Sequence, residues 1–98
     1  MKMCLWVFLL AYSCAVCANN AGQDTYEHFC ISCHQDGVAG APKFHDKIDW
    51  DARLAGKTLD DLLASAMNGV NAMPAQGTCS ECSEDDIRAA ITYMMPKS

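Results

Sequence analysis

The amino-acid sequence predicts an all-α protein with about four helices in one small domain. Three observations support this prediction. Apolar residues recur at helical spacing in several segments, and at two points a Ser or Thr is followed three positions later by Asp, as at a capped helix start. No segment shows the apolar-polar alternation that is typical of a half-buried strand.

The N-terminal residues read as a secretory signal peptide that lies outside this domain. Lys2 precedes the apolar run CLWVFLLAY, which is shorter than the roughly 20 residues that a membrane helix needs. Small residues at Val16 and Ala18 favour cleavage before Asn19, with a later site as far as residue 21. We therefore expect a leader over 1–18 and the domain over 19–98, with an uncleaved or lipidated N-terminus as the alternative.

The charge balance excludes one class of partner. The chain has seven basic and twelve acidic side chains and a formal net charge of −5, which becomes one unit more negative if Lys2 leaves with the leader. A nucleic-acid-binding protein needs clustered Lys and Arg, so nucleic acid is not expected as a partner. A protein with a basic docking surface is a better candidate, and membrane contact is expected only through partners or a retained N-terminus.

The first helix is expected from about Gly22 into Cys33. Tyr26, Phe29 and Cys30 recur between these two residues at helical spacing, so the cysteines are predicted to share a buried face with two aromatic rings. After the helix, a segment with two glycines and a proline, QDGVAGAPKFHDK, has no periodicity and is expected to be a loop.

The remaining helices follow from caps and apolar stripes. A short helix is expected from near Asp49, through Trp50 and Arg53, to Gly56. The next has Thr58 as its N-cap, Gly69 as its end, and an apolar stripe made of Leu59, Leu62, Leu63, Ala66 and Met67. After a second loop, VNAMPAQGTCSEC, Ser83 is expected to cap the last helix, whose inner face carries Ile87, Ala90, Ile91 and Met94.

The most informative motif is CISCH, from Cys30 to His34. A CxxC pair occurs in zinc sites, in thioredoxin-like redox centres and at haem attachment sites, and the His that follows favours haem. The nearest alternative is a four-thiolate zinc site that Cys30 and Cys33 would share with a second pair, Cys79 and Cys82. The redox-pair alternative usually requires a strand before the motif, and no strand signal is visible.

The two axial ligands of such a haem iron can be assigned from the same pattern. His34 is the expected proximal ligand, because it directly follows the second cysteine. Met73 is the expected sixth ligand, since it lies in a loop before Pro74, whereas Met67 and Met94 fit the apolar faces of helices. Histidine opposite methionine closes the coordination sphere and raises the reduction potential, which favours outer-sphere transfer of single electrons.

The order of these motifs resembles the class I c-type cytochromes, and the cytochrome c5 family in particular. The likeness rests on CxxCH, then GAPK, a Trp and an Arg three residues apart, NAMP and GTCSECS, and it covers the chain from Gly22 to Met95. It implies a small cytochrome c fold around one covalently attached haem c. It also implies that Gly22 and Tyr26 cross the last helix near Ile91 and Met94.

The resemblance implies further site residues. Pro42 would accept the proton of the His34 ring through its backbone carbonyl, and Trp50 and Arg53 would lie near a haem propionate. Cys79 and Cys82 would form a disulfide, although a redox-active role for that pair stays open.

Together these inferences predict a periplasmic mono-haem electron carrier between respiratory redox partners, and not an enzyme. The alternative is an electron-transfer subunit dedicated to one haem or respiratory enzyme complex.

Overall fold

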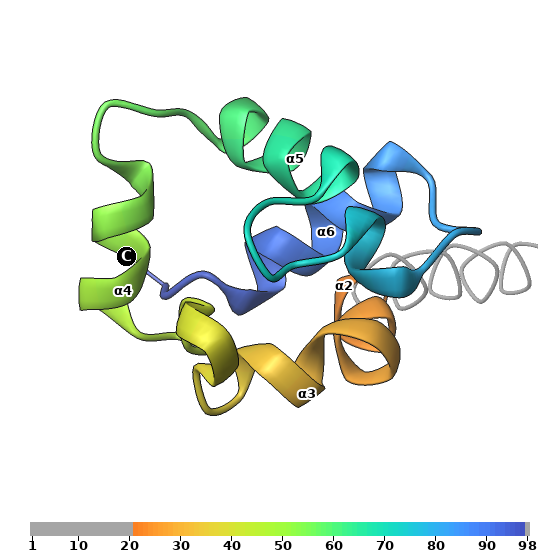
Figure 1. Ribbon diagram of the computed structural model, residues 1–98, viewed down its shortest axis with the longest axis horizontal. Coiled ribbons are helices and arrows are strands. Elements are labelled where there is room, and N and C mark those ends of the chain that lie inside the picture. Colours follow the sequence, from red (N-terminus) through yellow and green to blue (C-terminus); the bar gives the residue numbers. More distant parts are fainter. Residues whose placement is uncertain (1–20, 98) are drawn as a thin grey trace, which may run out of the picture.

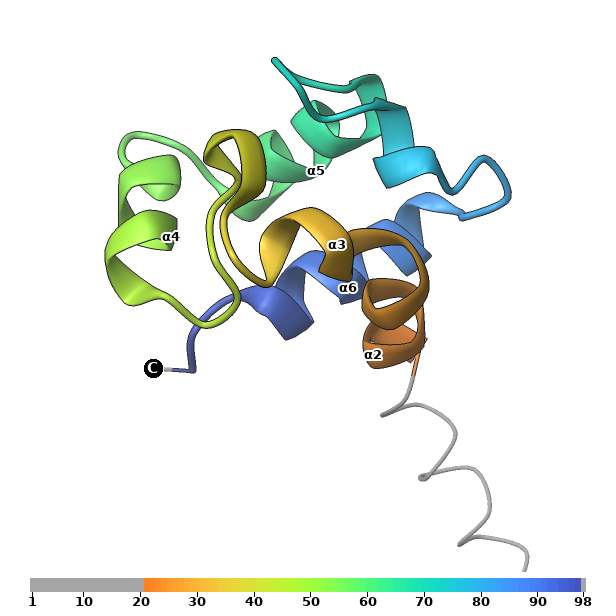
Figure 2. The same cartoon turned by 60° about the horizontal axis from the view of Figure 1, so that its bottom comes forward.

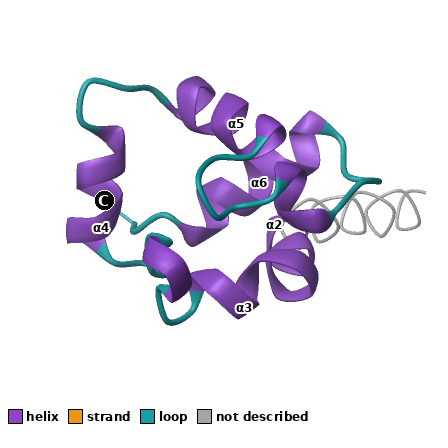
Figure 3. Ribbon diagram, in the orientation of Figure 1, coloured by secondary structure: helices purple, strands orange, loops and turns teal. Residues whose placement is uncertain are grey.

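The computed structural model describes residues 21–97, and the expected leader over 1–18 lies outside the described residues. Within the described range every regular element is helical, and the only β-type pairing is an isolated bridge between Val70 and Met73 (Figure 3). The all-α prediction is therefore confirmed. No helix in this part of the chain is long and apolar enough to cross a membrane.

The first helical segment is continuous but changes its helix type. It consists of α2 (Ala21–Thr25), a π-helical turn η2 (Tyr26–Cys30) and α3 (Ile31–His34). The prediction of one helix whose buried face includes both aromatic rings and both cysteines is partly wrong. Tyr26 and Cys30 are buried, but Phe29 is 41% exposed and Cys33 is exposed as well. The wider π turn changes the angular spacing of side chains, so the 3.6-residue period does not hold across it.

A short helix follows the first loop. The loop contains the 3-10 turn η3 (Val38–Gly40), and α4 (Lys47–Leu54) begins two residues before the predicted start at Asp49. The earlier start is explained by Asp46, whose side chain accepts a hydrogen bond from the Asp49 N–H and so caps the helix. In both views α4 lies at the end of the molecule opposite α2 (Figures 1 and 2).

The last two helices match their predictions closely. Helix α5 (Leu59–Asn68) begins with a capping box between Thr58 and Asp61. Helix α6 (Glu84–Met94) begins with the same arrangement between Ser83 and Asp86. The predicted inner face of α6 is buried, and it packs into one core with Tyr26, Trp50, Leu63 and Ala66. Between these helices lies a second loop with the 3-10 turn η4 (Ala75–Thr78).

Helix α6 lies between two other helices, since α2 crosses it and α5 packs beside it (Figures 1 and 2). The α2–α6 crossing depends on Gly22. A Cβ atom at this position would lie 2.4 Å from the backbone oxygen of Ala89. Gly22 therefore lies at the crossing with the last helix, as the resemblance implied, and its direct partner there is the backbone of Ala89.

Candidate functional site

The main cavity of the described residues has a volume of about 420 Å³. Three segments that are distant in sequence surround it: the CISCH motif with Phe29, the loop over 38–42, and the loop over 70–78. Cys30, Cys33, His34 and Met73 all line it. The fold thus brings the four residues singled out from the sequence around one space.

His34 is buried, with 7% of its surface exposed, and its ring is fixed by one hydrogen bond. Nδ1 lies 2.9 Å from the carbonyl oxygen of Pro42. A carbonyl only accepts, so the ring carries its proton on Nδ1, and Nε2 keeps a lone pair that can bind a metal. Pro42 therefore has the position that the resemblance implied.

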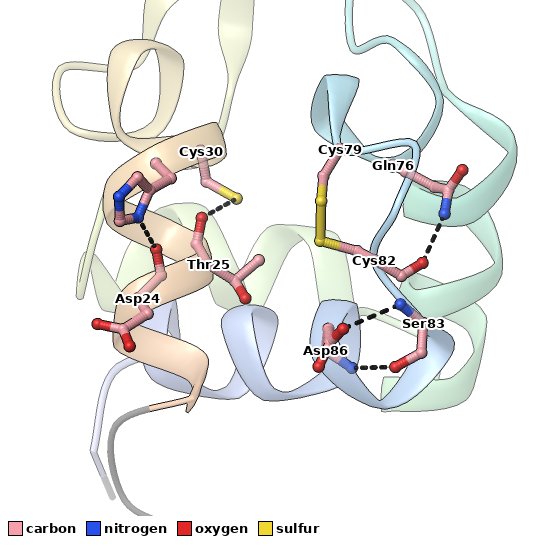
Figure 4. The surroundings of a disulfide bond; sticks show 9 residues. Asp24, Thr25, Cys30, Gln76, Cys79, Cys82, Ser83 and Asp86 are labelled. Carbon is pink, nitrogen blue, oxygen red and sulfur yellow. Dashed lines mark hydrogen bonds between the residues drawn. A yellow bond between two sulfur atoms is a disulfide. The ribbon is translucent and has the colours of Figure 1, made fainter.

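The two cysteines of the motif have different surroundings. Cys30 is buried at the end of the π turn, and its sulfur lies 3.9 Å from the Thr25 carbonyl oxygen, on the side turned toward the other cysteine pair (Figure 4). Burial raises the pKa of the Cys30 thiol to about 11, so this thiol is protonated at neutral pH. Cys33 is exposed at the wall of the cavity.

The second cysteine pair has formed a disulfide. Cys79 and Cys82 are bonded to each other in the turn that leads into α6, and Nε2 of Gln76 donates to the Cys82 carbonyl oxygen at 2.9 Å (Figure 4). A four-thiolate zinc site would need these two sulfurs as free thiolates. Within residues 21–97 no group of three or more His, Cys, Asp or Glu side chains is arranged to hold a metal ion. The disulfide argues against the zinc alternative.

Met73 is held in a tight turn of the second loop. Its N–H donates to the Val70 carbonyl at 2.8 Å, and its own carbonyl accepts from the Val70 N–H at 3.1 Å. The turn packs closely against Gly69, where a Cβ atom would lie 3.1 Å from the Met73 carbonyl oxygen and 3.0 Å from the Ala75 nitrogen. A positive φ of 85° at Gly69 also favours glycine. These contacts fix the backbone of Met73.

Trp50 and Arg53, the predicted propionate contacts, both line a smaller neighbouring cavity of about 110 Å³, and Arg53 also lines the main one. Their N–H groups donate to backbone carbonyls: the Trp50 indole to Lys43 at 2.8 Å, and the Arg53 guanidinium to Gly40. A role toward a propionate stays a prediction for both.

Sequence reasoning missed the apolar rim of the main cavity. Phe29, Val38 and Val70 line this cavity and are 41%, 51% and 41% exposed. Phe29 was assigned to the core because its spacing fits an α-helix, and the valines lie in loops where no periodicity marks a face. Each valine directly follows a loop glycine, Gly37 or Gly69, and this was the only available signal in the sequence.

Comparison with known proteins identifies the family to which this arrangement belongs. A family model described as cytochrome C oxidase, cbb3-type, subunit III matches residues 18–94. Cytochrome c5 of Azotobacter vinelandii is 44% identical over 75 residues, which cover 76% of this chain and 90% of the relative. The chain belongs to the cytochrome c5 family.

Solved structures agree with this assignment. A cytochrome c crystallised in an electron transfer complex with nitrite reductase gives a TM-score of 0.69 at 43% identity, covering 76% of this chain and 89% of the other. A mono-haem ferrocytochrome c from Shewanella putrefaciens gives 0.67 at 45% identity, covering 74% and 89%. This cytochrome is therefore a mono-haem electron carrier with one covalently bound haem c.

The residues around the cavity fit this cofactor. Two free thiols lie at its wall, beside a buried imidazole whose Nδ1 faces the Pro42 carbonyl and a thioether from the second loop. A nitrogen and a soft sulfur suit haem iron, and the neighbouring small and apolar side chains suit the porphyrin.

Proposed function

We propose that this chain is a periplasmic electron carrier in which Cys30 and Cys33 bind haem c through thioether bonds and His34 and Met73 are the axial ligands. One observation carries the proposal. A single cavity is bounded by both free thiols of the motif, by the imidazole whose Nδ1 faces the Pro42 carbonyl, and by Met73.

When bound, the haem iron would supply a one-electron redox couple, which an axial thioether shifts toward the reduced state. The protein contributes position and surroundings. Pro42 fixes the tautomer of His34, and the bridge between Val70 and Met73 holds the second loop. Phe29 and several small side chains line the cavity that would hold the haem.

The surface around the cavity supports exchange of electrons with protein partners. The exposed rim of Phe29, Val38 and Val70 offers an apolar contact at the cavity mouth. The chain carries twelve acidic and seven basic side chains, so a partner with a basic docking surface would be attracted to it. The neighbour that was crystallised with nitrite reductase supports a redox enzyme as such a partner.

Replacing Met73 with Ala tests the axial ligand. The ferric wild type should show the weak far-red charge-transfer band of thioether-ligated haem, and the Met73→Ala protein should lose it while keeping its haem. Met67→Ala is a matched control, because Met67 is a partly buried methionine of the core outside the cavity lining. An unchanged band in Met73→Ala would disprove the ligation.

A second candidate function is a subunit dedicated to one enzyme complex. It is favoured by the family model, which describes a subunit of a cytochrome oxidase. Gentle purification distinguishes the two. A carrier should elute alone, and its reaction rates with a basic partner should fall steeply as salt rises, whereas a dedicated subunit should co-purify with its enzyme in a fixed ratio.

A periplasmic location implies that the signal peptide is removed on export. The mature periplasmic protein should begin at Asn19, or as late as after residue 21, and N-terminal sequencing would find Met1 instead if the leader were retained.

A further inference from the structure

The loop segment over 40–46, which we call the His34 strap, is tied to His34 at one end and to helix α4 at the other. Within it, the Pro42 carbonyl accepts from Nδ1 of His34, and the Phe44 N–H donates to the His34 carbonyl at 2.7 Å. The strap is bound to helix α4 by the next residue, since the Lys43 N–H donates to Oδ2 of Asp49 at 3.1 Å.

The contacts of His34 and Asp49 meet on one peptide unit. The Pro42 carbonyl and the Lys43 N–H belong to the same peptide bond, which is planar and resonance-stabilised. Its oxygen faces the imidazole while its hydrogen faces the carboxylate. A charged acceptor on the N–H side polarises the unit and makes its oxygen a better acceptor, because hydrogen bonds in a chain strengthen one another.

We propose that Asp49 is a positioning residue for the axial His34, acting through the Pro42–Lys43 peptide. The carboxylate polarises this peptide and increases the negative charge on the Pro42 oxygen, which strengthens the hydrogen bond from Nδ1. The imidazole then becomes a stronger donor to iron, as when a carboxylate binds a ligating histidine directly. The inference rests on the axial ligation of His34 proposed above.

The state and surroundings of Asp49 suit this role. The Lys43 backbone N–H, and after it the Lys43 ammonium, hold the pKa of the Asp49 carboxyl below its usual range, so the carboxylate is charged at neutral pH. Nζ of Lys43 lies 3.2 Å from Oδ2 and offsets part of the charge, and Arg53 also attracts it. The Asp49 N–H is itself bound to Oδ1 of Asp46 at 3.0 Å, which fixes the backbone from which the carboxylate extends.

Trp50 also stabilises the His34 strap, through a hydrogen bond to the carbonyl group of Lys43. Its side chain is buried, its indole donates to the Lys43 carbonyl, and its ring lies 15° from parallel to the His34 imidazole with centroids 6.3 Å apart. The strap is thus held in one orientation, so a change at Asp49 alters the polarity of the peptide without releasing the loop.

The experiment compares Asp49→Asn with Asp51→Asn in the haem-loaded protein. Both changes remove one negative charge from helix α4, but among residues 21–97 Asp51 pairs only with Lys47, at 2.6 Å on the helix surface. Asp49→Asn should favour the reduced state about threefold more than Asp51→Asn does, a potential difference of about 30 mV for a one-electron couple.

A second measurement separates the peptide route from general electrostatics. In the diamagnetic reduced protein, the NMR signal of the His34 Nδ1 proton should move upfield and exchange faster with solvent in Asp49→Asn, since its hydrogen bond weakens. Asp51→Asn should leave it unchanged. Asp49→Ala, which also lacks the acceptor oxygen, should give a larger shift, and it keeps the test decisive if the Asn side chain still binds the Lys43 N–H.

Two results would overturn the inference, and they are distinguishable. An unmoved Nδ1 signal in both Asp49 variants, in a protein whose His34 ring protons show the strong upfield shifts of an iron ligand, overturns the role of Asp49 alone. Wild-type His34 ring protons without those shifts overturn the proposed ligation and this inference together.

Discussion

The two CxxC pairs have the same spacing, but one is a pair of free thiols and the other is a disulfide. Cys30 and Cys33 lie in a continuous helical segment as free thiols, one buried and one exposed, at the wall of the cavity. Cys79 and Cys82 lie in a turn outside any long helix and are bonded to each other. The residue after each pair differs too, since His34 is buried at the site and Ser83 caps helix α6.

The difference shows that spacing alone does not assign the chemistry of a cysteine pair. In the helical segment, backbone hydrogen bonds fix the direction of each Cα–Cβ bond, and the two side chains have separate surroundings. In the turn, the backbone lets the sulfurs meet. The following residue then decides the use: an imidazole adds a metal ligand, and a hydroxyl adds a helix cap.

The largest expected effect comes from the first pair. Replacing Cys30 and Cys33 with Ser should abolish covalent haem attachment, because no thiol remains at the cavity wall. Haem staining after denaturing electrophoresis measures this directly. The matched control, Cys79→Ser with Cys82→Ser, should keep its stained band, and a stained Cys30/Cys33 variant would refute the assignment.

The next effect concerns the crossing of α2 and α6, the helices that adjoin the two cysteine pairs. Helix α2 leads into the first pair and α6 follows the second, so Gly22→Ala, whose Cβ would lie 2.4 Å from the Ala89 oxygen, should disturb both. We expect a loss of about 3 kcal/mol in unfolding free energy, as for overpacking against backbone. Denaturant unfolding measures it.

Gly56→Ala is the control for that change. Gly56 has a φ of 70° but no atom within 4 Å of a Cβ. Its loss should be only about 1 kcal/mol, from backbone strain. Equal losses at the two glycines would contradict the close approach.

Removal of the second pair should cost less stability. Replacing Cys79 and Cys82 with Ser opens a loop of four residues, which lowers the unfolding free energy by about 2 kcal/mol on the chain-entropy model. The thermal midpoint measures the loss, and the covalently attached haem should stay. A midpoint equal to that of wild type would show that the disulfide contributes no stability.

The smallest effect concerns the residue after the second pair. Ser83→Ala removes the side-chain acceptor for the Asp86 N–H, 3.1 Å away, and should cost about 1 kcal/mol. Thr58→Ala is the control, since Thr58 has the same capping box in α5, which follows no cysteine pair. Similar losses are expected, and a much larger loss at Ser83 would mean that its role goes beyond capping.

The parts of the fold that depend on local chemistry could be predicted from the sequence. Both capping boxes are formed by neighbours in sequence, and the end of α5 is marked by Gly69. Helix α4 was placed two residues late because its cap, Asp46, lies inside a loop without periodicity. The π turn was missed, since its register depends on packing against other elements and not on composition.

Some residues of the candidate site could likewise be predicted from the sequence, and others could not. CISCH and Met73 carry their own chemical signals, so they could be selected before the fold was known. Asp49 could not, because its contact with the Lys43 N–H depends on how the loop folds back onto α4. The exposure of Phe29 at the cavity rim likewise follows from the π turn.

The most direct test of the different chemistry of the two pairs is a mass measurement on the mature protein. After reduction and alkylation, we predict one added haem on the peptide with Cys30 and Cys33 and one alkyl group on each of Cys79 and Cys82. Without reduction, no cysteine of the domain should be alkylated. Alkylation of Cys30 or Cys33, or haem on the second pair, would contradict the account.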